Sequence, residues 1–191
     1  MTAILISIQP KYVADILNGE KTLEIRKDAP KEWKDYLSGK TKEKPKSKLV
    51  YIYCTIDNNA LLHKNIAGIW WVEDKKFRAK NKKLGIAPQP SYNGKVVGYF
   101  TLNKVSRTYE FYEQELLDKA CLSDNELFAY LKHDEGYAWH IDNLVIFDKP
   151  KEISEFYGCD LSWNCKTHDC KDCVCKRQLT RAPQSWQFIE V

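Results

Sequence analysis

The chain has 191 residues, of which 43% are hydrophobic and 29% are charged, and its formal net charge is +4. This length is typical of one domain and is sufficient for a hydrophobic core that needs no disulfides. The apolar run at residues 3–8 is far shorter than the ~20 residues that cross a membrane. It also lacks the preceding basic region of a signal peptide. We therefore expect a soluble, cytoplasmic protein with no membrane partner.

The first part of the chain predicts strands alternating with short helices. Residues 3–8 read as a buried strand. Pro10 suits the first turn of a helix, because the N–H that proline lacks would have no hydrogen-bond partner within the helix at that position. Gly19 is a natural end for that helix. A second short helix is expected at residues 30–37, followed by a strand at residues 49–54.

Between these elements, polar and apolar residues alternate in a way that predicts a strand. Leu23 and Ile25 share one face of it, whereas Thr22, Glu24 and Arg26 share the other. If the apolar face is buried, the opposite face presents a carboxylate beside a guanidinium. A plain salt bridge on an exposed strand is the structural alternative.

The middle of the chain has weaker patterns. Residues 66–72 are apolar enough for a strand or a buried segment, and the basic run at 75–83 has no clear period. Residues 94–102 predict a strand that continues toward Tyr109. Ser123 with Glu126 three residues later forms a capping box, which predicts a helix through Leu131.

The last part predicts one long strand at residues 137–147, ended by Pro150, and then a short helical turn. A Cys-rich loop at 159–177 and a terminal strand at 185–191 follow. Strands and short helices without a regular βαβ order favour an α+β fold on a barrel-like sheet. We expect a single domain over residues 1–191.

Charge is distributed unevenly. Residues 75–83 contain six cations and no acid, and residues 40–48 contain five lysines and one acid. Residues 110–135, by contrast, contain eight acids and two lysines. Clustered cations attract polyanions such as nucleic acid, but both basic stretches could equally be solvated loops. The acidic stretch leaves a protein partner as a further hypothesis.

The segment from residue 8 to residue 26 resembles the opening of ASCH domains, most specifically in the string Gly-Glu-Lys-Thr-Leu-Glu-Ile-Arg at 19–26. Residues 94–98 and 137–141 are similar to later strands of that family. The ending at 181–186 is similar to that of phage and bacterial members with a Cys-containing insert.

This resemblance implies a PUA-like fold, a small mixed β-barrel with short flanking helices. It also implies a cationic cleft that binds RNA or a modified nucleotide through Lys21, Glu24 and Arg26, with Thr22 on the same strand face. Aromatic rings stack on unpaired bases, so Tyr137 and Trp139 are candidates for base contacts, although their strand face also fits a core.

A hydrolase is the alternative function. Some small ASCH proteins remove the acetyl group of N4-acetylcytidine; they resemble this chain at Lys21 but have a threonine at the position of Glu24. For that reaction, or for RNA cleavage, Glu24 would serve as the base, with Lys21 or Arg26 stabilising the developing negative charge.

Five of the seven cysteines lie within residues 159–175. In a reducing compartment disulfides are disfavoured, so a structural zinc ion is one hypothesis. Free or redox-sensitive thiols are another. The candidate zinc ligands share one compact loop: Cys165, His168, Cys170, Cys173 and Cys175.

Overall fold

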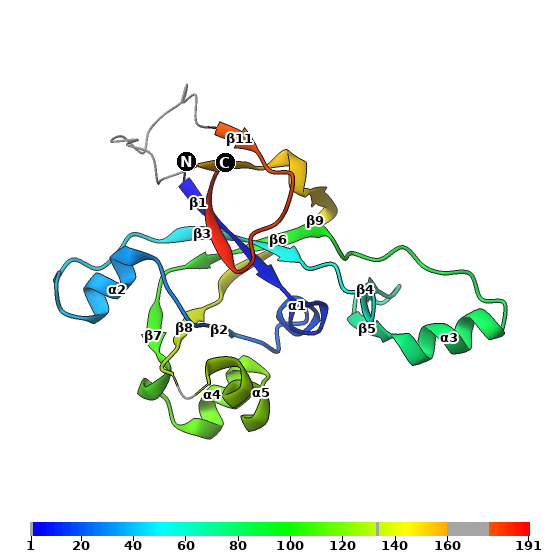
Figure 1. The fold of residues 1–191 in the computed structure, drawn as a ribbon, viewed down its shortest axis with the longest axis horizontal. Helices are drawn as coiled ribbons and strands as arrows, with labels where there is room; N and C mark the ends of the chain where they lie inside the picture. Colours follow the sequence, from blue (N-terminus) through cyan, green and yellow to red (C-terminus); the bar gives the residue numbers. More distant parts are fainter. Residues whose placement is uncertain (1, 133, 160–175) are drawn as a thin grey trace.

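The computed structural model describes residues 2–132, 134–159 and 176–191, and Figure 1 shows its fold. Within these residues the strands form a seven-stranded sheet, a three-stranded sheet and a two-stranded hairpin. The large sheet has the order β11 (Lys176–Gln178), β10 (Tyr157–Cys159), β12 (Trp186–Glu190), β1 (Thr2–Ile8), β3 (Lys48–Cys54), β6 (Lys95–Leu102) and β9 (Asp142–Glu152). The small sheet has the order β2 (Leu23–Arg26), β8 (Tyr137–His140) and β7 (Val105–Arg107), and the hairpin is β4 (Ala60–Lys64) with β5 (Trp70–Asp74).

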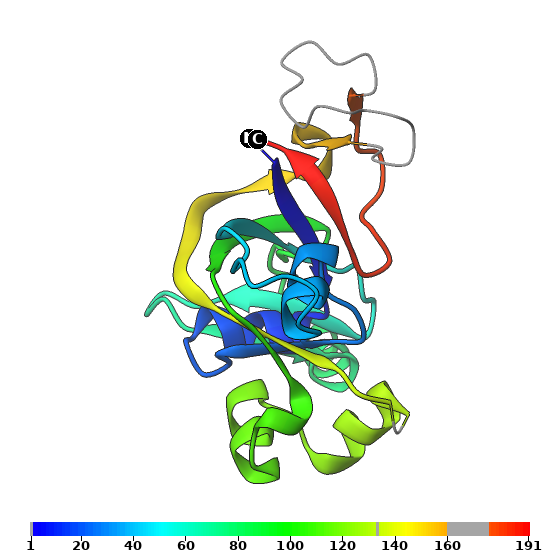
Figure 2. The same cartoon turned by 90° about the vertical axis from the view of Figure 1, so that its left-hand side faces the viewer.

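The helices of the described part are α1 (Pro10–Leu17), α2 (Lys31–Leu37), α3 (Lys75–Lys83), α4 (Glu113–Ala120) and α5 (Asp124–Leu131), with 3-10 turns at Thr108–Glu110 and Ile153–Glu155. In the large sheet, β1 pairs in parallel with β3 and antiparallel with β12. Figure 2 shows β9 curving around one side of the molecule, so that the strands wrap around the core. The prediction of an α+β fold is confirmed.

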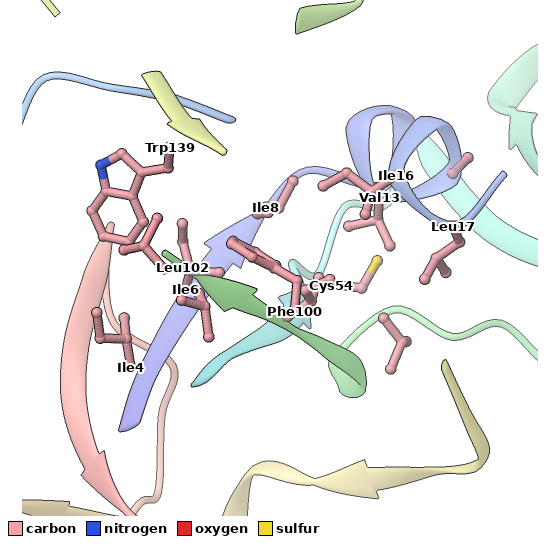
Figure 3. Close-up of a cluster of buried hydrophobic side chains, with 14 of the residues drawn as sticks. Ile4, Ile6, Ile8, Val13, Ile16, Leu17, Cys54, Phe100, Leu102 and Trp139 are labelled. Atoms are coloured by element: carbon pink, nitrogen blue, oxygen red, sulfur yellow. The ribbon is translucent and has the colours of Figure 1, made fainter. Parts of the chain in front are cut away.

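The main core lies between the large sheet and α1. In Figure 3, side chains of β1 and β6 pack between α1 at one end and Trp139 at the other. Ile6, Ile16 and Phe100 are all fully buried there. A separate cluster packs α4 and α5 against the small sheet through Leu23 and Ile25. All four residues of β2 are buried. Within the described ranges, no helix has the length and apolar character that crossing a membrane demands.

Several predicted elements are confirmed. Pro10 opens α1, and Gly19 follows the end of that helix with a φ of +80°, which favours glycine. The capping box of α5 forms as predicted, because the Ser123 hydroxyl accepts a hydrogen bond from the Glu126 amide and the Glu126 carboxylate accepts one from the Ser123 amide.

The prediction of one strand at residues 137–147 is correct at its start, Tyr137, but wrong in its continuity and its end. The chain leaves the small sheet at Ile141, whose amide donates to the Thr22 carbonyl, and enters the large sheet as β9. Pro150 does not end β9, which continues to Glu152. Because β9 is the last strand in the order of the large sheet, a proline there removes no hydrogen bond that the sheet needs.

The prediction of a strand or buried segment at residues 66–72 is confirmed only for residues 70–72, which lie in β5. Ile66 is fully exposed and lies in the turn of the β4–β5 hairpin, where the Asn65 side chain accepts hydrogen bonds from the amides of Ala67 and Ile69. The basic run that follows is a helix, α3. Asp74 caps it by accepting a hydrogen bond from the Phe77 amide. A helix with no apolar stripe has no hydrophobic period, so the sequence pattern could not reveal it.

Candidate functional site

A cleft of about 1040 Å³ opens where α1, β2, α5 and the start of β12 meet. The end of β1 supplies Ser7 and Ile8 to its wall, α1 supplies Tyr12, and α5 supplies Tyr130. Trp186 comes from the beginning of β12. The cleft therefore combines segments from both ends of the chain, and its charged floor lies on β2 and on the residues just before it.

The floor consists of three charged side chains that are almost entirely buried. Lys21, Glu24 and Arg26 have exposures of 3%, 6% and 7%. One oxygen of the Glu24 carboxylate lies 2.9 Å from the Arg26 guanidinium, and the other lies 3.4 Å from the Lys21 amine. Buried charges are tolerated when they are paired, so this arrangement holds a carboxylate between two cations beneath an open cleft.

Backbone carbonyls fix both cations. Arg26 donates from Nη2 to the Ser7 carbonyl at 2.7 Å, and its Nη1 lies 3.4 Å from Ser185 Oγ. Lys21 donates to the Ala120 carbonyl at 2.6 Å. These contacts join β2 to β1 and to α4. Contacts with other elements, and not the geometry of the strand alone, therefore orient the side chains of the floor.

Tyr12 covers the Lys21 end of the floor. The Lys21 amine lies 5.3 Å from the centre of the Tyr12 ring, a cation–π distance. The Tyr12 hydroxyl donates to the Glu126 carboxylate at 3.3 Å. Burial, together with the nearby Glu126 charge, raises the pKa of Tyr12 to about 12, so this wall of the cleft stays protonated and uncharged at neutral pH.

Glu126 lies at the edge of the cleft, here called the rim, and is held there by Lys11 and Ser123 as well. Its carboxylate accepts hydrogen bonds from the Lys11 amine at 2.7 Å and from the Ser123 hydroxyl at 2.8 Å. These bonds, with Lys11 the largest cause, lower the pKa of Glu126 to about 2. The same side chain therefore caps α5 and fixes α1 to it across the cleft.

The lining of the cleft is balanced in charge. The basic side chains that line it are Lys21, Arg26 and Lys27, and the acidic ones are Glu24, Asp28 and Glu126. The expectation of a cationic cleft is therefore wrong, because three acidic side chains line it beside the three basic ones. The floor offers polar recognition groups rather than a strong positive field.

Three other predicted contact residues do not line the cleft. Thr22 is exposed and precedes β2, where its amide donates to the Lys119 carbonyl. Trp139 is completely buried and packs edge-on against Trp186 with the ring centres 5.6 Å apart, so the prediction that it contacts a base is wrong. Tyr137 is half-buried beneath the Arg107 guanidinium, 5.3 Å from its ring centre.

The aromatic side chains that do line the cleft are Tyr12, Tyr130 and Trp186. Sequence patterns did not single out Tyr12 or Tyr130, because each lies on a short helix whose exposed face has no distinguishing period. The 181–186 string was a usable signal, since it supplies Ser185 and Trp186 to the cleft wall.

The five candidate zinc ligands, at positions 165, 168, 170, 173 and 175, lie outside the described residues. Within the described residues, no cluster of His, Cys, Asp and Glu side chains is arranged to hold a metal ion. Cys54 is fully buried, and burial raises the pKa of its thiol to about 12, as expected of a small apolar core residue.

Crystal structures of an ASCH protein share this fold. ASCH from Zymomonas mobilis matches with a TM-score of 0.54 and 15% sequence identity over 98% of this chain and 87% of that chain. A serine-to-alanine variant of the Zymomonas mobilis protein matches with a TM-score of 0.53 and 15% identity over 98% and 88%. No model of a known protein family matches, and no curated protein does. The ASCH fold suggested by the string at 19–26 is thus confirmed over nearly the whole chain.

Proposed function

We propose that this protein is an ASCH-type, PUA-like module that binds one unpaired nucleotide of an RNA, or a modified nucleotide, in the cleft above Glu24. The observation that carries the proposal is the buried floor, in which Lys21 and Arg26 hold a carboxylate in one orientation beneath the cleft. A carboxylate accepts hydrogen bonds from an exocyclic amino group, which adenine, guanine and cytosine carry.

The walls suit a base as well. Tyr12, Tyr130 and Trp186 offer aromatic surface, and stacking on a base contributes about 1–3 kcal/mol for each ring. Unpaired RNA presents bases that can be inserted into such a pocket, whereas duplex bases are inaccessible. Because the lining is balanced in charge, recognition depends on the base more than on its phosphate.

The contacts of Glu24 and Ser7 favour binding over hydrolysis. Both oxygens of Glu24 already contact a cation, so the carboxylate is a fixed hydrogen-bond acceptor. The Ser7 hydroxyl, which lines the cleft, donates to the Pro183 carbonyl at 2.6 Å. It is therefore oriented toward the backbone and not toward Glu24 as an activated nucleophile would be.

The test is calorimetric titration with the four ribonucleoside monophosphates and with N4-acetylcytidine. We expect at least one of them to bind, with weak dependence on salt. Glu24→Gln should weaken that binding about tenfold or more, because it removes a charge-assisted hydrogen bond. Thr22→Val, just outside the cleft, is the matched control and should leave binding unchanged.

Thermal unfolding separates lost binding from lost folding. If Glu24→Gln fails to fold, Tyr130→Ala on the cleft wall replaces it and should weaken binding by about fivefold or more. Binding of none of the five compounds, or equal binding by wild type and by the cleft variant, would refute the proposal. Release of acetate from N4-acetylcytidine would favour the hydrolase instead.

A further inference from the structure

A second feature lies away from the cleft. Residues 60–90, here called the arm, comprise the β4–β5 hairpin, α3 and the segment that follows α3. Figure 1 shows α3 at the far end of the arm, with α1 between the arm and β2. The hairpin is attached to α1, and Asn18 bonds both polar groups of the Trp70 backbone at 2.9 and 3.0 Å.

Helix α3 has an unusual composition for a helix that packs on a protein. Its nine residues include Lys75, Lys76, Arg78, Lys80, Lys82 and Lys83 and no acid, and none of its residues is buried. Like charges four residues apart, such as Lys76 and Lys80, destabilise an isolated helix. Neither core packing nor helix stability therefore explains so many exposed cations on one helix.

A pocket of about 550 Å³ lies beside α3, a size typical of small-molecule sites. Trp71 forms part of its wall. The Trp71 ring stacks at 5.1 Å and 32° on His63 and meets Phe77 edge-on at 5.8 Å. Ile86 and Pro88 line the pocket from the segment after α3. These walls are largely apolar, which suits the face of a nucleobase.

Two polar side chains at the side of the pocket are buried. His63 is 2% exposed and Glu73 is 7% exposed. The His63 Nδ1 lies 3.1 Å from the Pro90 carbonyl oxygen, and its Nε2 lies 3.1 Å from the Glu73 carboxylate. Both ring nitrogens therefore have a partner, and these contacts fix the Glu73 carboxylate, a hydrogen-bond acceptor, at the side of the pocket.

Arg78 and Lys82 add positive charge at the same pocket. Arg78 donates from Nη1 to the Asn58 carbonyl at 3.0 Å, and its Nε is 3.8 Å from the Glu73 carboxylate. Its Nε and Nη2 are buried and have no hydrogen-bond partner among the described residues. The Arg78 guanidinium therefore fixes the wall of the pocket, and the lysines of α3 remain to contact a phosphate attached to a stacked base.

We propose that the arm is a second nucleic-acid site, which binds single-stranded RNA by inserting one base beside Trp71 while Lys82 and the other exposed lysines of α3 contact its phosphates. This site goes beyond the nucleotide cleft, and it stands whether or not the cleft takes a nucleotide. Charge complementarity selects the occupant, because six cations without an acid match a polyanionic strand.

Fluorescence anisotropy with a labelled single-stranded RNA of about 12 nucleotides tests the proposal across a salt series. The test variant carries Lys76→Gln, Lys80→Gln and Lys83→Gln, all exposed. The control carries Lys42→Gln, Lys44→Gln and Lys46→Gln, also exposed, and loses the same charge from the other basic stretch. We expect the α3 variant to bind about tenfold more weakly and its log–log salt slope to fall by about 2, with no change in the control.

Trp71→Leu tests the base pocket and should weaken RNA binding about fivefold or more, with thermal unfolding measured in parallel. A duplex of the same sequence should bind more weakly than the single strand. Equal losses in the two triple variants, or affinity that neither α3 nor Trp71 affects, would overturn the proposal. Mononucleotide titration of the cleft variants is independent of these results, so the failure of one proposal is distinguishable from the failure of the other.

Discussion

The cleft and the arm use charged residues in opposite ways. In the cleft floor, Lys21, Glu24 and Arg26 are buried and bound to each other or to backbone carbonyls. On α3 no side chain is buried, and six cations project from nine residues without an acid. Buried, paired charges determine orientation, whereas exposed charges, such as the five lysines of α3, are available to an external polyanion.

The difference teaches that cations in a sequence do not by themselves indicate a basic surface. The string at 19–26 contributes a floor in which a carboxylate lies between two cations. The run at 75–83 contributes the concentrated positive charge. If both sites bind one RNA, the cleft contributes selectivity with little dependence on salt, and the arm contributes affinity that falls steeply with salt.

The largest expected effect on the free energy of unfolding is in the cleft floor. Arg26→Leu removes one partner of Glu24 and the donor to the Ser7 carbonyl, which should lower the free energy of unfolding by about 3–5 kcal/mol. Urea unfolding measures it. Lys27→Leu, the exposed neighbour, is the control and should change stability by less than about 1 kcal/mol. Equal effects of the two variants would mean that the floor is not a buried ion network.

An intermediate effect is expected at the rim. Glu126→Gln weakens the α5 cap and the Lys11 contact, so it should lower stability by about 1 kcal/mol at neutral pH. The pKa of Glu126 is depressed to about 2 in the folded protein, below its usual 4.5. The stabilisation is therefore present above pH 4.5 and is lost as pH falls toward 2.

Thermal unfolding between pH 7 and pH 3 checks the rim prediction. The difference between wild type and Glu126→Gln should shrink as the pH falls below about 4.5, since glutamine does not titrate. Glu115→Gln, which breaks an exposed pair with Lys119, is the control and should have a smaller effect at every pH. A difference that stays constant with pH would contradict the assignment.

The smallest expected effect is in the arm. The triple variant at Lys76, Lys80 and Lys83 removes mutual repulsion from exposed positions, so its unfolding free energy should change by less than about 0.5 kcal/mol, toward greater stability. Urea unfolding at low salt measures it best, because salt screens the repulsion. A loss of more than about 1 kcal/mol would mean that these lysines hold the arm together, and the contrast with the cleft floor would disappear.

Local sequence patterns were sufficient for much of the fold. The apolar run of β1, the proline at the start of α1 and the Ser123 capping box each depend on neighbouring residues, and all three predictions are confirmed. The alternation at β2 also placed Glu24 and Arg26 on one face. Periodicity failed for α3, which has no apolar stripe, and for the strand at 137–147, which changes sheets at Ile141.

The sequence alone therefore determined the ASCH-like class of the fold and the residues of the cleft floor. Only the tertiary structure decided that the floor is buried and balanced in charge, that Trp139 belongs to the core, and that Tyr12, Tyr130 and Trp186 form the walls. The reason is physical. Strand and helix signals come from residues a few positions apart, whereas a cleft brings together side chains from distant segments, whose burial and pairing depend on how those segments pack.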